Sequence, residues 1–153
     1  MKGKLMVGAG LVVAAVIVGL LASGIGPAQA TEGVAPEEVV TGFYEWYLGY
    51  IGEGERTRNP LVDRSYRSSE FLSEGFVAEV DAVLDSFEGG GYCPFLLAQD
   101  VPVSVSVGEA EFSGGEAQVT VELFWGGNPT PSERVVTVRL IDGQWKIAAV
   151  NMK

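Results

Sequence analysis

The chain has 153 residues, of which 20 are acidic and 10 basic, giving a formal charge of −10, and it contains no histidine. A chain this acidic repels phosphate backbones and anionic lipid surfaces, so nucleic acid is not an expected partner. A basic protein or a cation is electrostatically easier to bind, but a plain soluble acidic surface is the favoured interpretation. The absence of histidine removes His-based catalytic triads, histidine bases and nearly all transition-metal sites, and we expect neither a metal nor another cofactor.

Residues 1–30 have the order of a secretory signal peptide. Lys2 and Lys4 form a short positive region, and no charged residue occurs from Leu5 to Leu21. A helix-breaking stretch and the small residues of Ala28-Gln29-Ala30 follow, as a signal peptidase requires. We expect cleavage after Ala30 and an extracellular or periplasmic mature chain with no stable membrane span. The alternative is an uncleaved N-terminal anchor, since the apolar run is just long enough to span a bilayer.

A short lead-in over residues 31–35 precedes a first helix predicted over 36–51. Pro36 fits the first helical turn, and the two acids after it lie where the helix dipole favours negative charge. Apolar and aromatic residues recur at helical spacing and predict a buried stripe: Val40, Phe43, Tyr44, Tyr47 and Ile51. Gly52 then ends the helix.

Two further helices are predicted before the strands begin. Asn59-Pro60 is typical of a helix cap followed by a first-turn proline, which indicates a short helix near 60–66. A longer helix is predicted over 69–88, and a run of three glycines from Gly89 stops it.

From Val101 onward the apolar period changes from helical to alternating, which predicts four strands. Turn signals at Ser113-Gly114-Gly115 and Asp142-Gly143 separate strands, and the second is a strong hairpin signal. Trp145 shares an apolar strand face with Ile147, so we expect it to be a core residue. The sequence predicts one α+β domain over 36–153, in which N-terminal helices pack on one face of a curved four-stranded antiparallel sheet.

Three segments of the chain resemble a known family: Phe43 to Tyr47, Tyr92 to Asp100, and Gly143 to Ile147. They are similar to the uncharacterised exported bacterial proteins catalogued as domain of unknown function 3828. The resemblance implies the nuclear transport factor 2-like, cystatin-like fold. Cys93 stands where we expect an acid before the Pro-Phe pair, so a role that rests on an acidic pair with Asp100 is not implied. The family has no established activity.

The segment that joins the helices to the sheet is the first candidate site. It contains Pro94, Phe95, Gln99 and Asp100, and the implied fold would place it near the mouth of the cone between helices and sheet. Asp100 is either a general base or ligand contact in a cavity, or it satisfies backbone groups together with Gln99 in a buried turn. The second interpretation is the one we favour, because polar groups inside an apolar run commonly serve turns.

Tyr44 and Tyr47 are the second candidate. Some enzymes of the implied fold, such as ketosteroid isomerases, pair a tyrosine on the first helix with an acid to stabilise an enolate. Aromatic residues at helical spacing are more commonly plain core, which is the favoured interpretation here.

Four arginines within twelve positions and a single cysteine complete the candidate residues. Arg56, Arg58, Arg64 and Arg67 could hold an anion, but surface ion pairs with the surrounding acids are the favoured interpretation. Cys93 cannot form an internal disulfide and is interpreted as a small buried apolar residue; a free thiol or an intermolecular bridge is the alternative.

Three functions remain open from the sequence. The favoured one is a non-catalytic exported binding module with a small apolar pocket for a small molecule. The second is an interaction or inhibitor domain whose acidic surface meets a basic protein. The third is a cofactor-free isomerase or hydrolase that uses Asp100 and a tyrosine. A homodimer is compatible with all three.

Overall fold

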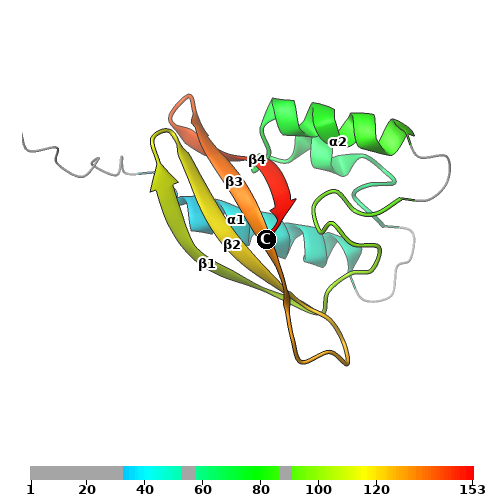
Figure 1. The fold of residues 1–153 in the computed structure, drawn as a ribbon. Coiled ribbons are helices and arrows are strands. Elements are labelled where there is room, and N and C mark those ends of the chain that lie inside the picture. Colours follow the sequence, from blue (N-terminus) through cyan, green and yellow to red (C-terminus); the bar gives the residue numbers. More distant parts are fainter. Residues whose placement is uncertain (1–32, 53–57, 87–90) are drawn as a thin grey trace, which may run out of the picture.

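The computed structural model describes residues 33–52, 58–86 and 91–153. The elements in chain order are α1 (Pro36–Ile51), the 3-10 helix η1 (Ser65–Ser68), α2 (Glu74–Ser86), β1 (Ser104–Ser113), β2 (Glu116–Phe124), β3 (Ser132–Ile141) and β4 (Gln144–Met152). Helices precede strands, and the fold is α+β as predicted (Figure 1). The predicted signal peptide lies outside the described ranges, and within those ranges no helix is long and apolar enough to cross a membrane.

The first helix, α1, begins and ends at the residues that the sequence predicted. The Glu38 carboxylate accepts a hydrogen bond from the Ala35 N–H at 3.3 Å, which satisfies a donor at the start of the helix. Gly52 closes α1 with a φ of 54°, a conformation that costs glycine little. The buried face carries three large aromatic side chains, Phe43, Tyr44 and Tyr47.

The predicted short helix near 60–66 is wrong in position. Asn59 does act as a cap, since its Oδ1 accepts a hydrogen bond from the Leu61 N–H at 2.9 Å. The residues after it form only a turn, because the backbone reaches a left-handed conformation at Arg64, where φ is 60°. The helical turn that follows is η1, and it holds Tyr66 in the core.

The longer helix, α2, begins at Glu74 and not at residue 69 as predicted. Residues 71–73 are instead drawn to β4, where the Ile147 N–H donates to the Phe71 carbonyl at 2.8 Å and the Ser73 N–H donates to the Ile147 carbonyl at 2.9 Å. The Ser73 hydroxyl then accepts a hydrogen bond from the Phe76 N–H at 3.2 Å and caps α2. The last two predicted residues of this helix, 87 and 88, lie outside the described ranges.

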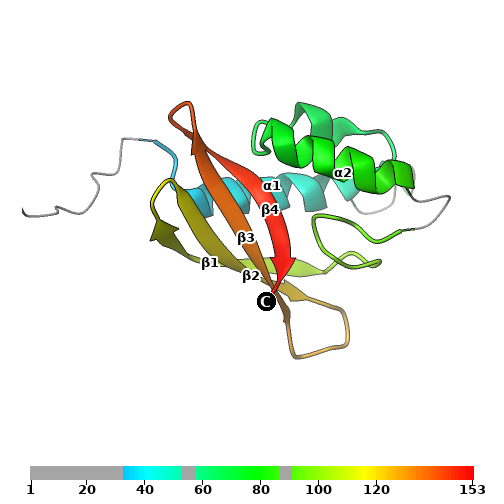
Figure 2. The same ribbon diagram turned by 45° about the horizontal axis from the view of Figure 1, so that its top comes forward.

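The four strands form an antiparallel sheet in the order β1-β2-β3-β4, which confirms the predicted meander. Alternate residues of β2 are buried, and the side chains between them face the other side of the sheet. Figure 2 shows α1 running across one face of the twisted sheet, while α2 lies on the β4 side. One face of the sheet is therefore covered by helix, as the alternation predicted.

The hairpin between β3 and β4 turns at the predicted dipeptide. Asp142 and Gly143 have φ values of 50° and 79°, which is the pair of positive angles that a tight hairpin of this twist requires. A bulge interrupts the pairing of β1 with β2 between Val107 and Ala110. A Cβ at Gly108 inside the bulge would lie 3.2 Å from the Thr120 carbonyl, so the close approach of the two strands favours glycine there.

At two places in and beside the sheet, residues that were predicted to be buried or to lie in a strand are not. Trp145 is only half-buried, because it lies at the start of β4 where its ring packs edge-to-face on Phe112 at 5.8 Å, and Phe112 is itself 65% exposed. Val101 and Val103 were predicted to belong to the first strand, but β1 begins at Ser104 and both valines are exposed.

Candidate functional site

Residues 93–98 form a tight loop between the helices and the sheet, which we call the 93–98 loop. The Cys93 N–H donates to the Ala98 carbonyl and the Leu97 N–H donates to the Cys93 carbonyl, each at 2.7 Å. Leu97 adopts a positive φ of 49°, which is uncommon for a residue with a side chain. The loop thereby turns Phe95 and Leu96 into the interior, where both are fully buried.

Phe95 fills the space between α1, η1 and α2. Its ring lies 5.1 Å from Phe43 and 5.6 Å from Tyr47 between centroids, and the rings of Tyr66 and Phe76 pack edge-to-face on it at 5.6 and 5.9 Å. The interior beside α1 is therefore occupied by the chain's own side chains.

The candidate tyrosines bond to the 93–98 loop. The Tyr44 hydroxyl donates to the Phe95 carbonyl at 2.8 Å, and the Tyr47 hydroxyl lies 3.1 Å from the Cys93 sulfur. Burial and the neighbouring Cys93 raise the pKa of both hydroxyls well above its usual range, so both stay protonated at neutral pH. Their hydrogen bonds hold the loop against α1, a role that the sequence interpretation of plain core did not include.

The remaining candidates of this segment separate into two groups. Pro94 is buried beside Phe95, whereas Gln99 and Asp100 are exposed. The interpretation of Gln99 and Asp100 as members of a buried turn is therefore wrong, because the loop closes at Ala98 before it reaches them. The structure brings Tyr44, Tyr47 and Phe95 together and leaves Asp100 outside this cluster.

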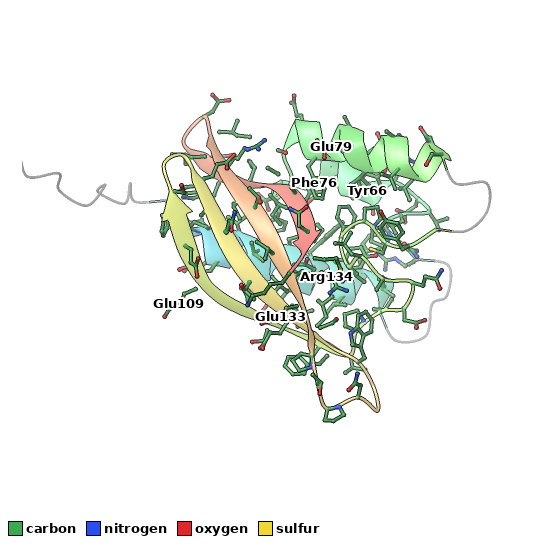
Figure 3. All side chains as sticks on the ribbon, viewed as in Figure 1. Tyr66, Phe76, Glu79, Glu109, Glu133 and Arg134 are labelled. Carbon is green, nitrogen blue, oxygen red and sulfur yellow. The ribbon has the colours of Figure 1, made fainter. Side chains whose placement is uncertain are left out.

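Sequence reasoning missed a buried cation on the sheet. Arg134 on β3 is only 3% exposed, and its Nε donates to the Leu96 carbonyl at 2.7 Å while its Nη1 donates to the Glu133 carbonyl at 2.9 Å. Burial lowers the pKa of the guanidinium. Figure 3 shows Arg134 directed toward the 93–98 loop. The signal in the sequence was its place in the alternation with Val136 and Val138, which puts it on the inner face.

Two described arginines of the basic cluster, Arg64 and Arg67, form ion pairs with acids of α2, as favoured from the sequence. Arg64 contacts Asp81 at 3.1 Å and Asp85 at 2.7 Å, and Arg67 contacts Asp81 at 3.0 Å. The Tyr66 hydroxyl, followed by Arg67, lowers the pKa of the Asp81 carboxyl. Arg58 stacks on an aromatic ring, that of Tyr50, with 4.7 Å from its guanidinium carbon to the ring centroid, and Arg56 lies outside the described ranges.

Cys93 is the free thiol of the chain, and it is buried as predicted. Burial raises the pKa of the thiol, so the reactive thiolate is disfavoured at neutral pH.

An open groove runs between α1 and β1, and we call it the α1–β1 groove. It has two lobes of about 430 and 590 Å³ that share Thr41, Glu45 and Val107. The first lobe is lined by four acids: Glu37, Glu38, Glu45 and Glu109. The second lobe is lined mainly by apolar and hydroxyl residues: Tyr44, Leu48, Val103, Ser104 and Val105. Figure 3 shows Glu109 at the β1 side of the sheet, far from α2.

The acidic lobe lacks a compensating cation. Neither lobe has a lysine or arginine in its lining, and the Glu37 Oε2 atom is buried without a hydrogen-bond partner. An unpaired carboxylate oxygen beside three further glutamates makes this recess strongly negative. The groove can attract a cationic group and offers apolar contact at its other end.

Comparisons with known proteins identify the fold and not a family. No family model matches the sequence, and no curated protein matches it. Solved structures that match the fold include the native and selenomethionine crystal structures of the type VI effector-immunity complex Tae3-Tai3 from Ralstonia pickettii. Each match has 21% sequence identity and covers 78% of this chain, with TM-scores of 0.62 and 0.60 and coverage of 96% and 97% of the matched chain. At this identity the likeness concerns the fold alone.

Proposed function

We propose that this chain is an exported protein-binding domain that acts as the non-catalytic half of a two-protein complex of the effector-immunity kind. The observation that carries the proposal is the contrast between a filled interior and an open groove. Phe95 occupies the space beside α1 where a small molecule would sit, whereas the α1–β1 groove is open to another molecule. Among the functions open from the sequence, this favours the interaction or inhibitor domain.

The chemistry of the side chains supports a binding role over a catalytic one. The chain has no histidine, and the single cysteine is buried with a raised pKa. The two tyrosines that an isomerase would use bond to the 93–98 loop, and Asp100 lies exposed outside their cluster. The residues that the enzymatic alternative would use are therefore either engaged in structural hydrogen bonds or exposed outside the tyrosine cluster.

The structural neighbours support a protein partner. Both matched structures are complexes of two proteins, and the matched chain is covered almost completely. A domain that shares the fold over this length has the same surfaces available for a partner, although the identity of 21% leaves the partner to experiment.

We also infer that the chain belongs with the exported family named above, and that its fold is of the nuclear transport factor 2-like, cystatin-like kind. The helix-then-meander order supports this inference, as does the burial of the Pro94-Phe95 pair. The proposal includes export of the chain with cleavage of the signal peptide after Ala30.

Capture of the partner from the native host tests the proposed function. The tagged protein is cross-linked in intact cells, the captured protein is identified, and the complex is rebuilt from purified components. We expect one partner, bound with a stoichiometry of one to one in calorimetry. We also expect the partner to arrest growth when it is exported without this chain. Native mass spectrometry that finds only a bound small molecule, or turnover of a substrate by the chain alone, would contradict the proposal.

A further inference from the structure

We propose that the α1–β1 groove binds an extended basic segment of the partner protein, which adds to the sheet as a strand beside β1. This inference rests on the proposed function and specifies where and how the partner is held.

The two edges of the sheet are not equivalent. Residues 71–73 bond to both the N–H and the carbonyl of Ile147, so the β4 edge is occupied at that residue. No described segment pairs with the outer edge of β1. In an antiparallel strand every second N–H and C=O points away from its neighbour, so β1 offers a row of backbone donors and acceptors. Adding a strand to such an edge is a recurring way to bind an extended peptide.

The helix supplies the second wall of the groove. Glu38, Thr41, Glu45 and Leu48 follow one another at spacings of three and four, so they form one stripe along α1. The stripe is about 15 Å long, and the chain from Val103, just before β1, to Glu109 within it extends about 20 Å. A segment of about five or six extended residues therefore fits the groove.

The lining selects the chemistry of the segment. The glutamates at one end require lysine or arginine, because no basic residue among the described ones lines either lobe. The other end requires an apolar side chain, because Leu48 lies there with Val103, which is 71% exposed. The bound face of the segment thus carries two cations followed by an aliphatic residue.

A second copy of this chain does not meet these requirements. Pairing two β1 edges would bring the glutamates of both grooves together, and like charges facing across strands are destabilising. The bulge at Gly108 and the charge of Glu109 are devices that commonly keep an edge strand from pairing with itself.

Synthetic peptides provide the probe for strand addition. The test peptide is Thr-Lys-Thr-Lys-Thr-Leu-Thr or its reverse, with blocked ends, titrated into ¹⁵N-labelled protein. We expect amide shifts and slowed hydrogen exchange at Val103 and in the first residues of β1 up to Val107, and both effects should weaken as salt rises. A peptide with glutamate in place of lysine should not bind. Shifts centred on α2 or on the outer face of the sheet would overturn the proposal.

Methylated peptides separate strand addition from charge attraction. Only every second N–H of an added strand faces β1, so methylation of the threonine nitrogens and methylation of the lysine and leucine nitrogens should differ. One of the two methylated peptides should lose binding while the other retains it. Equal binding by both would overturn strand addition, and so would dimerisation of the protein through β1.

Charge-neutralising variants connect the groove to the real partner. Glu45→Gln with Glu109→Gln should weaken binding of the peptide and of the captured partner by about two- to fivefold for each charge removed. The matched control is Glu74→Gln with Glu79→Gln on α2, which should leave both affinities unchanged. A partner that binds the groove variant as tightly as wild type refutes the groove and leaves the proposed function standing. If no protein partner exists, the proposed function fails instead.

Discussion

Replacing Phe95 with alanine tests whether the interior is filled as described. Phe95 is completely buried, and four aromatic rings surround it at centroid distances from 5.1 to 5.9 Å. Emptying a buried phenylalanine site costs about 3–5 kcal/mol. Each lost edge-to-face contact adds to the cost of lost area, so we expect a value of about 4 kcal/mol or more. The free energy of unfolding of a domain is about 5–15 kcal/mol, so the variant is close to unfolding.

Urea unfolding followed by tryptophan fluorescence measures this loss. With a slope of about 2 kcal/mol per molar, the midpoint of unfolding should fall by about 2 M. Phe112→Ala is the matched control, because Phe112 is 65% exposed and packs against a single ring, that of Trp145. Its loss should stay below about 1 kcal/mol. A loss below about 1 kcal/mol at Phe95, or equal losses at the two positions, would refute the filled interior.

Three further perturbations test the surroundings of this core. Arg134→Met should lower the free energy of unfolding by about 1–3 kcal/mol, because the Leu96 carbonyl keeps its burial and loses its donor; an unchanged urea midpoint would contradict this. Asp81→Asn should destabilise the protein at neutral pH, because the Tyr66 hydroxyl and neighbouring arginines depress the pKa of Asp81. A depressed carboxyl stabilises the fold above its unfolded pKa, so the difference between variant and wild type should shrink as pH falls below about 4, and a difference constant with pH would contradict the assignment. Cys93 should resist alkylation by iodoacetamide at pH near 8 and react fully in urea, and rapid labelling of the folded protein would show that the thiol is not buried.

Local signals explain why much of the fold could be predicted. Pro36 and Gly52 mark the ends of α1 through backbone geometry that depends on neighbouring residues alone. The alternation in β2 and the Asp142-Gly143 turn are local in the same sense. Where a residue's conformation depends on its near neighbours, the sequence was a sufficient guide.

The errors arise where distant segments meet. Leu72 pairs with Ile147, and this contact straightens residues that a helical pattern claims for α2. Arg134 is buried because the 93–98 loop presents carbonyl groups to it, and no pattern near Arg134 reveals those groups. Asp100 is exposed for the same kind of reason, because the 93–98 loop closes before it.

The candidate site was predicted in part for the same reason. Tyr44, Tyr47 and Phe95 do lie together, since a buried aromatic stripe and an apolar loop share one core. The α1–β1 groove was not predicted, because Glu38 and Glu45 have the spacing of an ordinary solvated helix face. Glu38 and Glu45 line a groove because β1 lies at the edge of the sheet, and only the sheet order reveals that position.

The bridge between Leu72 and Ile147 has a consequence for the order in which the chain folds. Among the described strands β4 comes last in the chain, and residues 71–73 have no strand to join until it is synthesised. Contacts between such distant segments form late, because a long loop must close before they contribute. The pairing of residues 71–73 therefore forms only after β4 has been synthesised, which makes it a late step in folding. A chain that stops at Gly143 should consequently lose the hydrogen bonds of residues 71–73, which lead into α2, together with β4 itself.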